Sequence, residues 1–477
     1  MSQRDLSIHS VQRTYMNRHI LSLPLALGVA CTPPHESATS ITIPTPPDDD
    51  GIIQTYFVDA IHGDDTNSGL STNAPWKTLA RFSSVDLSTG DGIRLKRGGE
   101  WVGTLDLLAA GTAEAPITIE PYGEGSPPRI MGTKCLSPIC GNTDTLWTAE
   151  GNNIYRAHLD FTPGVVLSGD SALHFINYDT LASAKARMSP GSSFFEPSTS
   201  TLFVRTSSGS SPAEFNLQAA QQSFAIQLMG SRHIRIQGIA LRGSRRHCML
   251  ITHSTDIELD DLTIDYCGGQ WDEEGGFYLG NGVEIAGASA RITLRDSTLT
   301  DIFDSGVSPQ AYLWSDFAIE DVHIVGNRIE RCGLAGVEVT VWAQDAALRD
   351  IVIENNSLTE MGGGWAGQYN TNNINGVGIV AMAPDPSSAI SGLVIRGNTI
   401  TRGTLDGIAL GFDTGHVVID RNILQDNAGV GVFAWDDNVD TTTSAVLAWD
   451  RQNHSVPPDP VLPWGENLRP ESRSRRS

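Results

Sequence analysis

The sequence predicts an all-β protein built as a solenoid, in which short strands stack along one axis. A three-residue motif with an aliphatic residue at each end recurs seven times, and successive copies begin 23 to 42 residues apart. A minimum spacing with variable additions is typical of solenoids, whose insertions go to loops. Apolar and polar residues alternate with a period of two, which indicates strands. The copies begin at Ile234, Ile257, Ile292, Val322, Ile351, Leu393 and Val417.

The position three residues after each motif forms a second repeating column. In the last four copies it is Asn327, Asn356, Asn398 and Asn422. Side-chain amides stacked at the strand spacing of about 4.8 Å can hydrogen-bond to one another, so we expect an asparagine ladder at this turn. With these residues, the chain from about Tyr56 to Trp435 resembles the right-handed parallel β-helix proteins, the pectate-lyase-like group. The resemblance implies the fold but leaves activity open, because this scaffold serves lyases, hydrolases, epimerases and non-enzymatic adhesins.

Composition narrows the classes of partner. The chain has 477 residues, 40% of them hydrophobic, and a formal net charge of −23. A solenoid can grow without a limit on core size, so we expect one elongated, monomeric unit rather than several compact domains. The acidic balance argues against a nucleic-acid partner, which requires a basic surface. It also disfavours strongly acidic polysaccharides unless a bound cation such as Ca²⁺ reverses the charge locally.

The N-terminal residues 1–31 have the order of a secretory signal. Basic residues precede an apolar run from Ile20 to Ala30, which is too short to span a bilayer as a helix. The run ends at Cys31 in a segment that resembles a bacterial lipoprotein box, although Gly28 replaces the usual larger aliphatic residue. We therefore expect export, with lipidation of Cys31 and attachment to the bacterial outer membrane. The alternatives are simple secretion and a start at Met16.

The remaining boundaries follow composition and repeat pattern. We expect a disordered tether at 32–54, an N-terminal cap and first coils at 55–131, a β-rich insertion at 132–222, regular coils at 223–450 and a disordered tail at 451–477. Within the insertion, 194–197 and 202–204 flank turn residues and predict a hairpin.

The segment from Thr55 to Ile130 resembles the N-terminal cap of many bacterial β-helix proteins. The resemblance rests on Tyr56-Phe57-Val58, on 63–69 and on Ala74-Pro75-Trp76-Lys77-Thr78-Leu79. Pro75 suits a first helical turn that would align Trp76, Leu79 and Phe82 on one face and close the open end of the coils. Asp64, Asp65 and Asn67 are candidate Ca²⁺ ligands, but turn capping is the preferred interpretation.

Cysteine spacing predicts few disulfides. Cys135 and Cys140 can close a small loop. Cys267 and Cys332 lie two coils apart, roughly 10 Å between α-carbons, which is too far for a bridge. We expect Cys248, Cys267 and Cys332 to be buried free thiols.

A candidate site emerges from the third strand of each coil. Its outward position is expected to hold Met249, Glu284, Ser308, Glu338, Gly378, Ala409 and Gly431. Four residues further along come Ala288, Tyr312, Trp342, Met382, Asp413 and Trp435. One face therefore offers two carboxylates beside small residues and an interrupted aromatic stripe, and aromatic faces suit sugar rings.

Glu284 and Glu338 are the candidate catalytic pair. Their backbones should lie about 9.6 Å apart, twice the strand spacing, which is close to the carboxyl separation in inverting glycosidases. Asp304 precedes the intervening strand and is a third candidate. No metal ligand set is recognisable. The alternative is that outward glutamates are simply solvated strand residues.

Two long insertions, 266–280 and 361–375, should wall this face. They carry Trp271, Trp365 and Tyr369, which with Tyr312, Trp342, Asp413 and Trp435 are the candidate substrate-binding residues. We expect a glycan-cleaving enzyme, with hydrolysis preferred. A polysaccharide lyase is one alternative, with Arg245, Arg246, His247 or Tyr312 as candidate bases, because every lysine precedes the regular coils. A non-catalytic glycan-binding or adhesin-like surface protein is the other.

Overall fold

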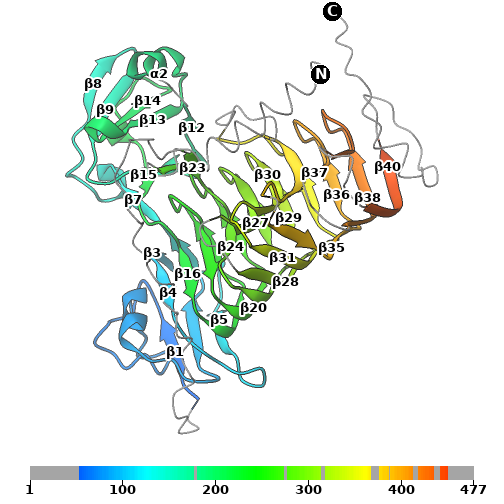
Figure 1. The fold of residues 1–477 in the computed structure, drawn as a ribbon. Coiled ribbons are helices and arrows are strands. Elements are labelled where there is room, and N and C mark those ends of the chain that lie inside the picture. The colour runs from blue at the N-terminus through cyan, green and yellow to red at the C-terminus, as the bar shows by residue number, and fades with distance from the viewer. Residues whose placement is uncertain are drawn as a thin grey trace, which may run out of the picture.

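The computed structural model describes residues 53–176, 180–272, 277–312, 317–366, 375–385, 387–411 and 417–434, together with the backbone of 441–449. The predicted signal, tether and tail, including Cys31, lie outside these residues. The described chain forms a right-handed parallel β-helix, as predicted (Figure 1). None of its helices has the length and apolar character needed to cross a bilayer.

Each coil contributes strands to three columns, and strands within a column pair in parallel. The first column contains β1 (Thr55–Val58), β2 (Gly92–Lys96), β5 (Ile117–Tyr122), β17 (Arg232–Gln237), β20 (Thr255–Asp260), β25 (Ala290–Arg295), β28 (Ala318–Val325), β31 (Ala347–Glu354), β34 (Ala389–Ser391), β35 (Leu393–Arg396), β38 (Val417–Gln425) and β40 (Thr441–Trp449). The second contains β3 (Glu100–Val102), β6 (Arg129–Met131), β18 (Ala240–Arg242), β21 (Thr263–Asp265), β26 (Thr298–Thr300), β29 (Arg328–Glu330), β32 (Ser357–Thr359) and β36 (Thr399–Thr401).

The third column is a separate sheet that carries the candidate site. It contains β4 (Leu105–Leu107), β16 (Ile226–Met229), β19 (Met249–Thr252), β24 (Val283–Ala286), β27 (Ser305–Ala311), β30 (Ala335–Val341), β33 (Val377–Met382), β37 (Ile408–Gly411) and β39 (Val432–Ala434). Aliphatic side chains from all three columns meet in one continuous core, to which one coil contributes Ile257, Ile264 and Ile285 from its three strands. Because the strand period is two, this shared interior fixes which side chains point outward.

The predicted asparagine ladder is confirmed. The Oδ1 of Asn356 accepts from the backbone N–H and the Nδ2 of Asn327, at 2.8 and 3.0 Å. The same pair of bonds links Asn356 to Asn398, and Asn398 to Asn422. Each of these amides is buried and thus has its partner directly above or below it. The ladder holds one corner of these four coils in register.

The N-terminal cap differs from its prediction. The only helix described there is the 3-10 helix η1 (Leu79–Ser84), so Pro75 and Trp76 precede it. Trp76 forms a bridge with Val58 and stacks on Tyr56, with ring centroids 4.9 Å apart, while Phe82 packs edge-on against it. Aromatic packing rather than a helical face therefore brings these side chains together over the end of the core. The Asp65 carboxylate accepts from the backbone N–H groups of Lys77 and Thr78, which is turn capping.

The insertion forms a lobe on the side of the coils (Figure 1). The predicted hairpin is present, with Phe194 opposite Phe203. One sheet contains β8 (Thr148–Gly151), β9 (Ile154–His158), β12 (His174–Phe175), β13 (Ser192–Glu196) and β14 (Thr201–Arg205). A second contains β7 (Thr133–Cys135), β10 (Val166–Ser168), β11 (Ser171–Ala172) and β15 (Leu217–Ala220). The helices are α2 (Leu181–Arg187), η2 (Pro138–Cys140), η3 (Pro197–Thr199) and η4 (Pro212–Glu214).

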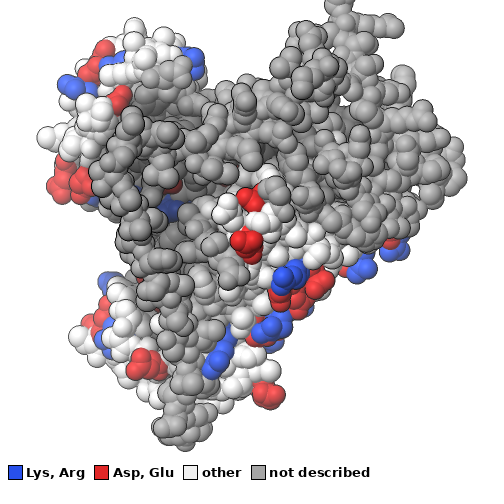
Figure 2. Space-filling view, viewed as in Figure 1, with Lys and Arg blue, Asp and Glu red and all other residues white. Residues whose placement is uncertain are grey.

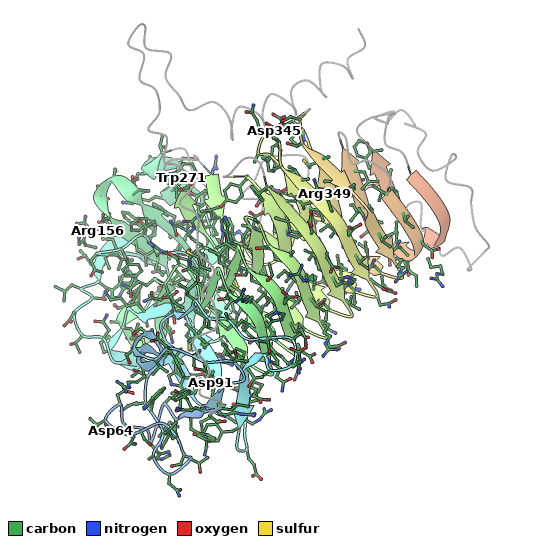
Figure 3. All side chains as sticks on the ribbon, turned by 60° about the horizontal axis from the view of Figure 1, so that its bottom comes forward. Asp64, Asp91, Arg156, Trp271, Asp345 and Arg349 are labelled. Atoms are coloured by element: carbon green, nitrogen blue, oxygen red, sulfur yellow. A yellow bond between two sulfur atoms is a disulfide. The ribbon has the colours of Figure 1, made fainter. Side chains whose placement is uncertain are left out.

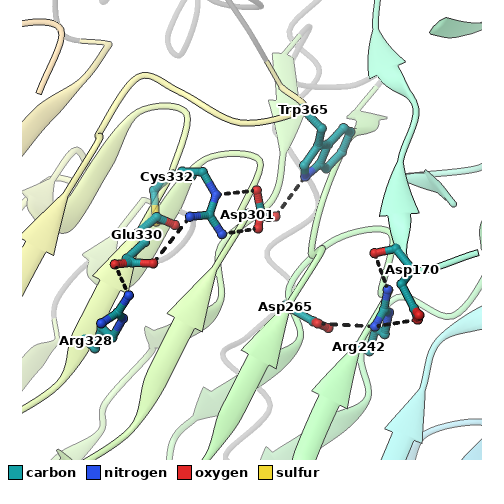
Figure 4. A network of polar contacts seen from close by, with 9 residues as sticks. Asp170, Arg242, Asp265, Asp301, Arg328, Glu330, Cys332 and Trp365 are labelled. Atoms are coloured by element: carbon teal, nitrogen blue, oxygen red, sulfur yellow. Dashed lines mark hydrogen bonds and ion pairs between the residues drawn. The ribbon is translucent and has the colours of Figure 1, made fainter. Parts of the chain in front are cut away.

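A buried arginine of the coils contacts an exposed aspartate of this lobe. Arg242 lies between Asp170 of the lobe and Asp265 of the next coil, at 3.7 and 3.5 Å (Figure 4). Burial raises the pKa of Asp265 to about 6 even though the Arg242 charge opposes that shift. Nearby, Arg331 binds both carboxylate oxygens of Asp301, whose backbone carbonyl accepts from the Trp365 indole (Figure 4). The lobe, through Asp170, and the second long loop, through Trp365, are therefore both attached to residues at the C-terminal ends of second-column strands.

Disulfide bonding is partly as predicted. Cys135 and Cys140 are bridged, and Cys332 is a buried free thiol. The prediction of free thiols at Cys248 and Cys267 is wrong, because they form a disulfide with their α-carbons 5.4 Å apart. Cys267 and Cys332 lie two coils apart and are not bridged. Cys248 directly precedes β19 and lies close to Cys267 of the next coil. The bridge ties the start of β19 to the loop that follows β21.

Candidate active site

The register of the third sheet places Glu284 and Glu338 on one outward column. Glu284 pairs with Ser308, and Val307 pairs with Val337, so that Ser308 lies between the two glutamates. Three of the seven positions predicted for this column need correction, namely Met249, Gly378 and Gly431. The aligned residues are Leu250, Glu284, Ser308, Glu338, Val380, Ala409 and Phe433.

A stack of glycines explains the error at Gly378 and Gly431. Glycine stands two residues before the outward position in successive coils, at Gly282, Gly306, Gly336, Gly378, Gly407 and Gly431. A Cβ on Gly378 would lie 2.5 Å from the carbonyl oxygen of Gly407, so close backbone approach requires glycine at this place in the coil. The error at Met249 is one residue of register, because Met249 points into the core and Leu250 aligns with Glu284.

Glu284 and Glu338 are buried rather than solvated, with 1% and 4% of their surfaces exposed. Their hydrogen bonding is unequal. Glu284 accepts from the Asn281 amide at 2.7 Å through Oε2, while its Oε1 is buried with no hydrogen-bond partner among the described residues. Glu338 accepts from the Ser305 hydroxyl at 2.9 Å and from the Thr340 hydroxyl at 3.4 Å. The charged form of Glu338 is thus the better stabilised of the two.

Asn281 and Ser305 connect the two carboxyl groups. The Asn281 side chain donates to Glu284 and accepts from the backbone N–H of Ser305 at 2.9 Å, and the Ser305 hydroxyl binds Glu338. The Asn281 backbone N–H in turn donates to Nδ1 of His247 at 3.0 Å. Burial, assisted by the charge of Arg246, lowers the pKa of His247 to about 3. His247 therefore remains a neutral acceptor that orients Asn281, rather than a cation.

Burial raises the pKa of both glutamates. For Glu284, the charges of Glu338 and Asp304 add to the effect of burial, and the Asn281 bond opposes it. For Glu338, the charge of Asp304 adds to burial, and the hydroxyl donors oppose it. The structure therefore brings the three predicted carboxyls into one electrostatic cluster. Such a cluster retains a proton near neutral pH, as an acid–base pair requires.

The predicted aromatic stripe is not an open platform. Trp342 is only 7% exposed and packs in an outward apolar cluster with Val377, Val380 and Met382. Tyr312 packs against the same cluster. Burial and the nearby charge of Glu284 raise the pKa of Tyr312, while the charge of Arg246 and its hydrogen bond to Tyr312 oppose that shift. Tyr312 and Trp342 therefore border the site as part of its packing.

The 266–280 loop forms a hairpin of β22 (Gln270–Asp272) and β23 (Phe277–Leu279), and its Trp271 packs edge-on against Tyr278 (Figure 3). From the second loop, Trp365 is 6% exposed and contacts Phe303, with ring centroids 5.1 Å apart. Phe175 of the lobe packs on both Tyr278 and Phe303. The two loops and the lobe form one aromatic wall, in which Trp365 is structural. Tyr369, Asp413 and Trp435 lie outside the described residues.

The sequence analysis missed Asn281 and Ser305, and it considered His247 only as a candidate base of a lyase. Asn281 stands between two glycines immediately before the strand of Glu284, and that position was the available signal. Its three hydrogen bonds join residues from different coils, which local sequence does not reveal. Within the described ranges, no group of three or more His, Cys, Asp or Glu side chains is arranged to hold a metal ion.

Comparisons with known proteins agree on the fold. No protein-family model matches the chain. XylC in complex with xylose superposes with a TM-score of 0.51 at 12% identity, covering 83% of this chain and 70% of that one. The GH136 lacto-N-biosidase from Eubacterium ramulus gives a TM-score of 0.44 at 15% identity, covering 80% of this chain and 56% of that one.

A curated lacto-N-biosidase from Bifidobacterium longum subsp. longum is 39% identical over 115 residues, which cover 22% of this chain and 7% of that protein. The chain therefore aligns with a small part of this relative and with little more than half of the E. ramulus enzyme. By its architecture, the chain is a right-handed parallel β-helix.

Proposed function

We propose that the protein is a glycoside hydrolase that cleaves a glycan on the outer face of the third sheet. The observation that carries this proposal is the pair of buried carboxyls, Glu284 and Glu338, joined through Asn281 and Ser305 but unequally hydrogen-bonded. The lacto-N-biosidase relative supports a glycan substrate. Pairs of carboxyl groups held in different protonation states perform acid–base hydrolysis of glycosides.

The hydrogen bonds suggest a role for each residue. Glu284 is the general acid, because burial favours its protonated form and its Oε1 is available to hold the proton. Glu338 is the general base, because two hydroxyl groups donate to its oxygens. In the reaction, Glu284 gives its proton to the glycosidic oxygen as the anomeric C–O bond breaks. Water attacks the anomeric carbon and transfers a proton to Glu338.

The spacing of the pair favours inversion. Two strand steps amount to about 9.6 Å between backbones, which leaves room for a water molecule on the face opposite the leaving group. Both carboxyls are almost fully buried, so a glycan reaches them only when side chains over this face, including Tyr312, move aside. Closing the site around the substrate would then exclude bulk water.

The proposal is tested by product analysis with a panel of neutral and uronic glycans. We expect new reducing ends without unsaturated sugars, and NMR should show the inverted anomer first. Unsaturated products would instead establish a lyase, and binding without cleavage would leave a glycan-binding protein.

Glu284→Gln tests the assignment of the acid. We expect a loss of about 10²- to 10⁴-fold in kcat on natural glycans, because the leaving oxygen no longer receives a proton. Aryl glycosides whose leaving group needs no protonation should be cleaved at nearly the wild-type rate. An equal loss on both classes of substrate would contradict the role of Glu284 as acid.

A further inference from the structure

We infer that Arg246, with Arg245 beside it, binds an anionic substituent of the glycan, a carboxylate or a sulfate ester, next to Glu284. This inference rests on the proposed function, because it names the class of substrate taken by the same site. Although the chain is strongly acidic, the guanidinium of Arg246 has no ion pair among the described residues.

Arg246 differs from most arginines of the coils. Arg291, Arg295 and Arg349, for example, each have an ion pair with an acidic residue of the neighbouring coil. Among the described residues Arg246 has no ion pair; its side chain hydrogen-bonds the neutral Tyr312 hydroxyl, and its Nε is buried without a partner. The Nε edge is one side of the fork with which a guanidinium binds an oxyanion in bidentate fashion.

The position of Arg246 is fixed by its backbone. The turn between β18 and β19 donates from the N–H groups of Arg245 and Arg246 to the carbonyls of Gln222 and Ser223. The Cys248–Cys267 disulfide follows directly. Leu250 pairs with Glu284, so this turn lies one coil from the acid. The Arg246 charge acts on both Glu284 and the Tyr312 hydroxyl, which places the guanidinium beside the carboxyl cluster.

Arg245 adds a second positive charge beside Arg246. Its guanidinium donates to the Thr162 carbonyl and the Ser223 hydroxyl, which are neutral acceptors. Burial and the charge of Arg246 both lower the pKa of Arg245, so the two cations lie close enough to repel each other. An oxyanion between or beside them would relieve this repulsion. Lysine would give a point charge without the planar fork.

Other polar atoms in the same region also lack partners. Ser244 Oγ, Gln270 Oε1, Glu284 Oε1 and Ser308 Oγ are buried, with no hydrogen bond among the described residues. Gln270 is next to the arginine turn, because its backbone N–H donates to the Arg245 carbonyl. Buried polar atoms without partners are costly unless a ligand or water satisfies them. A sugar with hydroxyl groups and one anionic substituent supplies both kinds of partner.

Anion binding would also assist the acid. The Arg246 charge lowers the pKa of Glu284, in opposition to burial. A bound anion would screen that charge, so that Glu284 keeps its proton to higher pH when the acidic sugar is in place. Recognition and catalysis would then be coupled through one side chain.

The test separates binding from turnover. Binding to the Glu338→Gln variant is measured by calorimetry with a uronic-acid oligosaccharide, the same oligosaccharide after carboxyl reduction, and a sulfated neutral oligosaccharide of equal length. We expect about 10- to 100-fold tighter binding of at least one anionic probe than of the reduced one, the usual range for charge-assisted hydrogen bonds. Arg246→Gln in the same background should remove that preference, Arg246→Lys should restore part of it, and Arg235→Gln on the opposite face should preserve it.

Equal binding of all three probes would overturn the inference, as would an equal loss for charged and neutral probes in Arg246→Gln. Either result leaves the proposed hydrolase intact, because cleavage by the wild-type protein is measured separately. Conversely, a preference for anions without cleavage of any glycan would retain the arginine site and refute the hydrolase. If Arg246→Gln does not fold, the comparison of the three probes in Glu338→Gln, where Arg246 is intact, still decides the matter.

Discussion

Acidic side chains have opposite environments on two outer faces of the coils, those of the first and third columns. On the first column, acidic residues stand opposite arginines of the next coil in strand register, as in Glu258 with Arg235 and Glu320 with Arg349. Figure 2 shows these alternating charges along one edge of the molecule, and Figure 3 labels Arg349. On the third column, Glu284 and Glu338 have no arginine in register and are separated by Ser308.

The comparison indicates where a carboxylate serves the fold and where it does not. Exposed pairs in register contribute little each and improve strand matching. Burying Glu284 and Glu338 close to each other and to Asp304 costs stability, because charged groups lose hydration and repel each other. A cost that the fold does not require is expected at a functional site.

The largest expected difference concerns activity. Glu338→Gln removes the proposed base, and we expect kcat to fall by about 10²- to 10⁴-fold. Glu258→Gln makes the same chemical change on the other face and should leave kcat unchanged. Both variants are assayed on the glycan found by product analysis. If the two lose activity to a similar extent, the third face has no special role.

The second difference concerns stability and pH. Burial raises the folded-state pKa of Glu338 above that of the unfolded chain, so this group favours folding at low pH and becomes unfavourable as pH rises through its raised pKa. Glu338→Gln should therefore be more stable than wild type at pH of about 8 by several kcal/mol, since burial raises the pKa of Glu338 from 4.5 to about 8 and one pKa unit corresponds to about 1.4 kcal/mol. The difference should shrink toward pH of about 4.

Urea unfolding of both proteins at the two pH values measures this effect, and Glu258→Gln is the control. A stability difference that stays constant with pH would show that Glu338 does not carry a raised pKa in the folded protein.

The smallest expected effect lies on the first column. Arg349 is 51% exposed in its pair with Glu320, so solvent screens the interaction. We expect Arg349→Ala to lower the free energy of unfolding by at most about 1 kcal/mol. High salt should reduce the difference further. A loss of several kcal/mol in urea unfolding would show that the charge ladder is a main source of stability, and the contrast between the faces would weaken.

Some of the site was accessible from sequence because it follows the repeat. The spacing of Asn327, Asn356 and Asn398 predicts the turn, and the alternation around Glu284 and Glu338 predicts that both point outward. The prediction failed where the register of the outward column shifts between coils. Gly378 was counted as an outward position although it belongs to the glycine stack, and a shift by two moved the column from Val380 to Gly378.

The sequence by itself determined the coil, because strand period, motif spacing and stacked asparagines are local and repeat. Only the tertiary structure decided the environment of the carboxyls. Glu258 and Glu284 both point outward from short strands, yet one meets Arg235 in water and the other is buried beside Asn281. Burial, charge coupling and the free edge of Arg246 arise from residues of different coils, the loops and the inserted lobe. Those contacts depend on how the coils stack, which no single strand encodes.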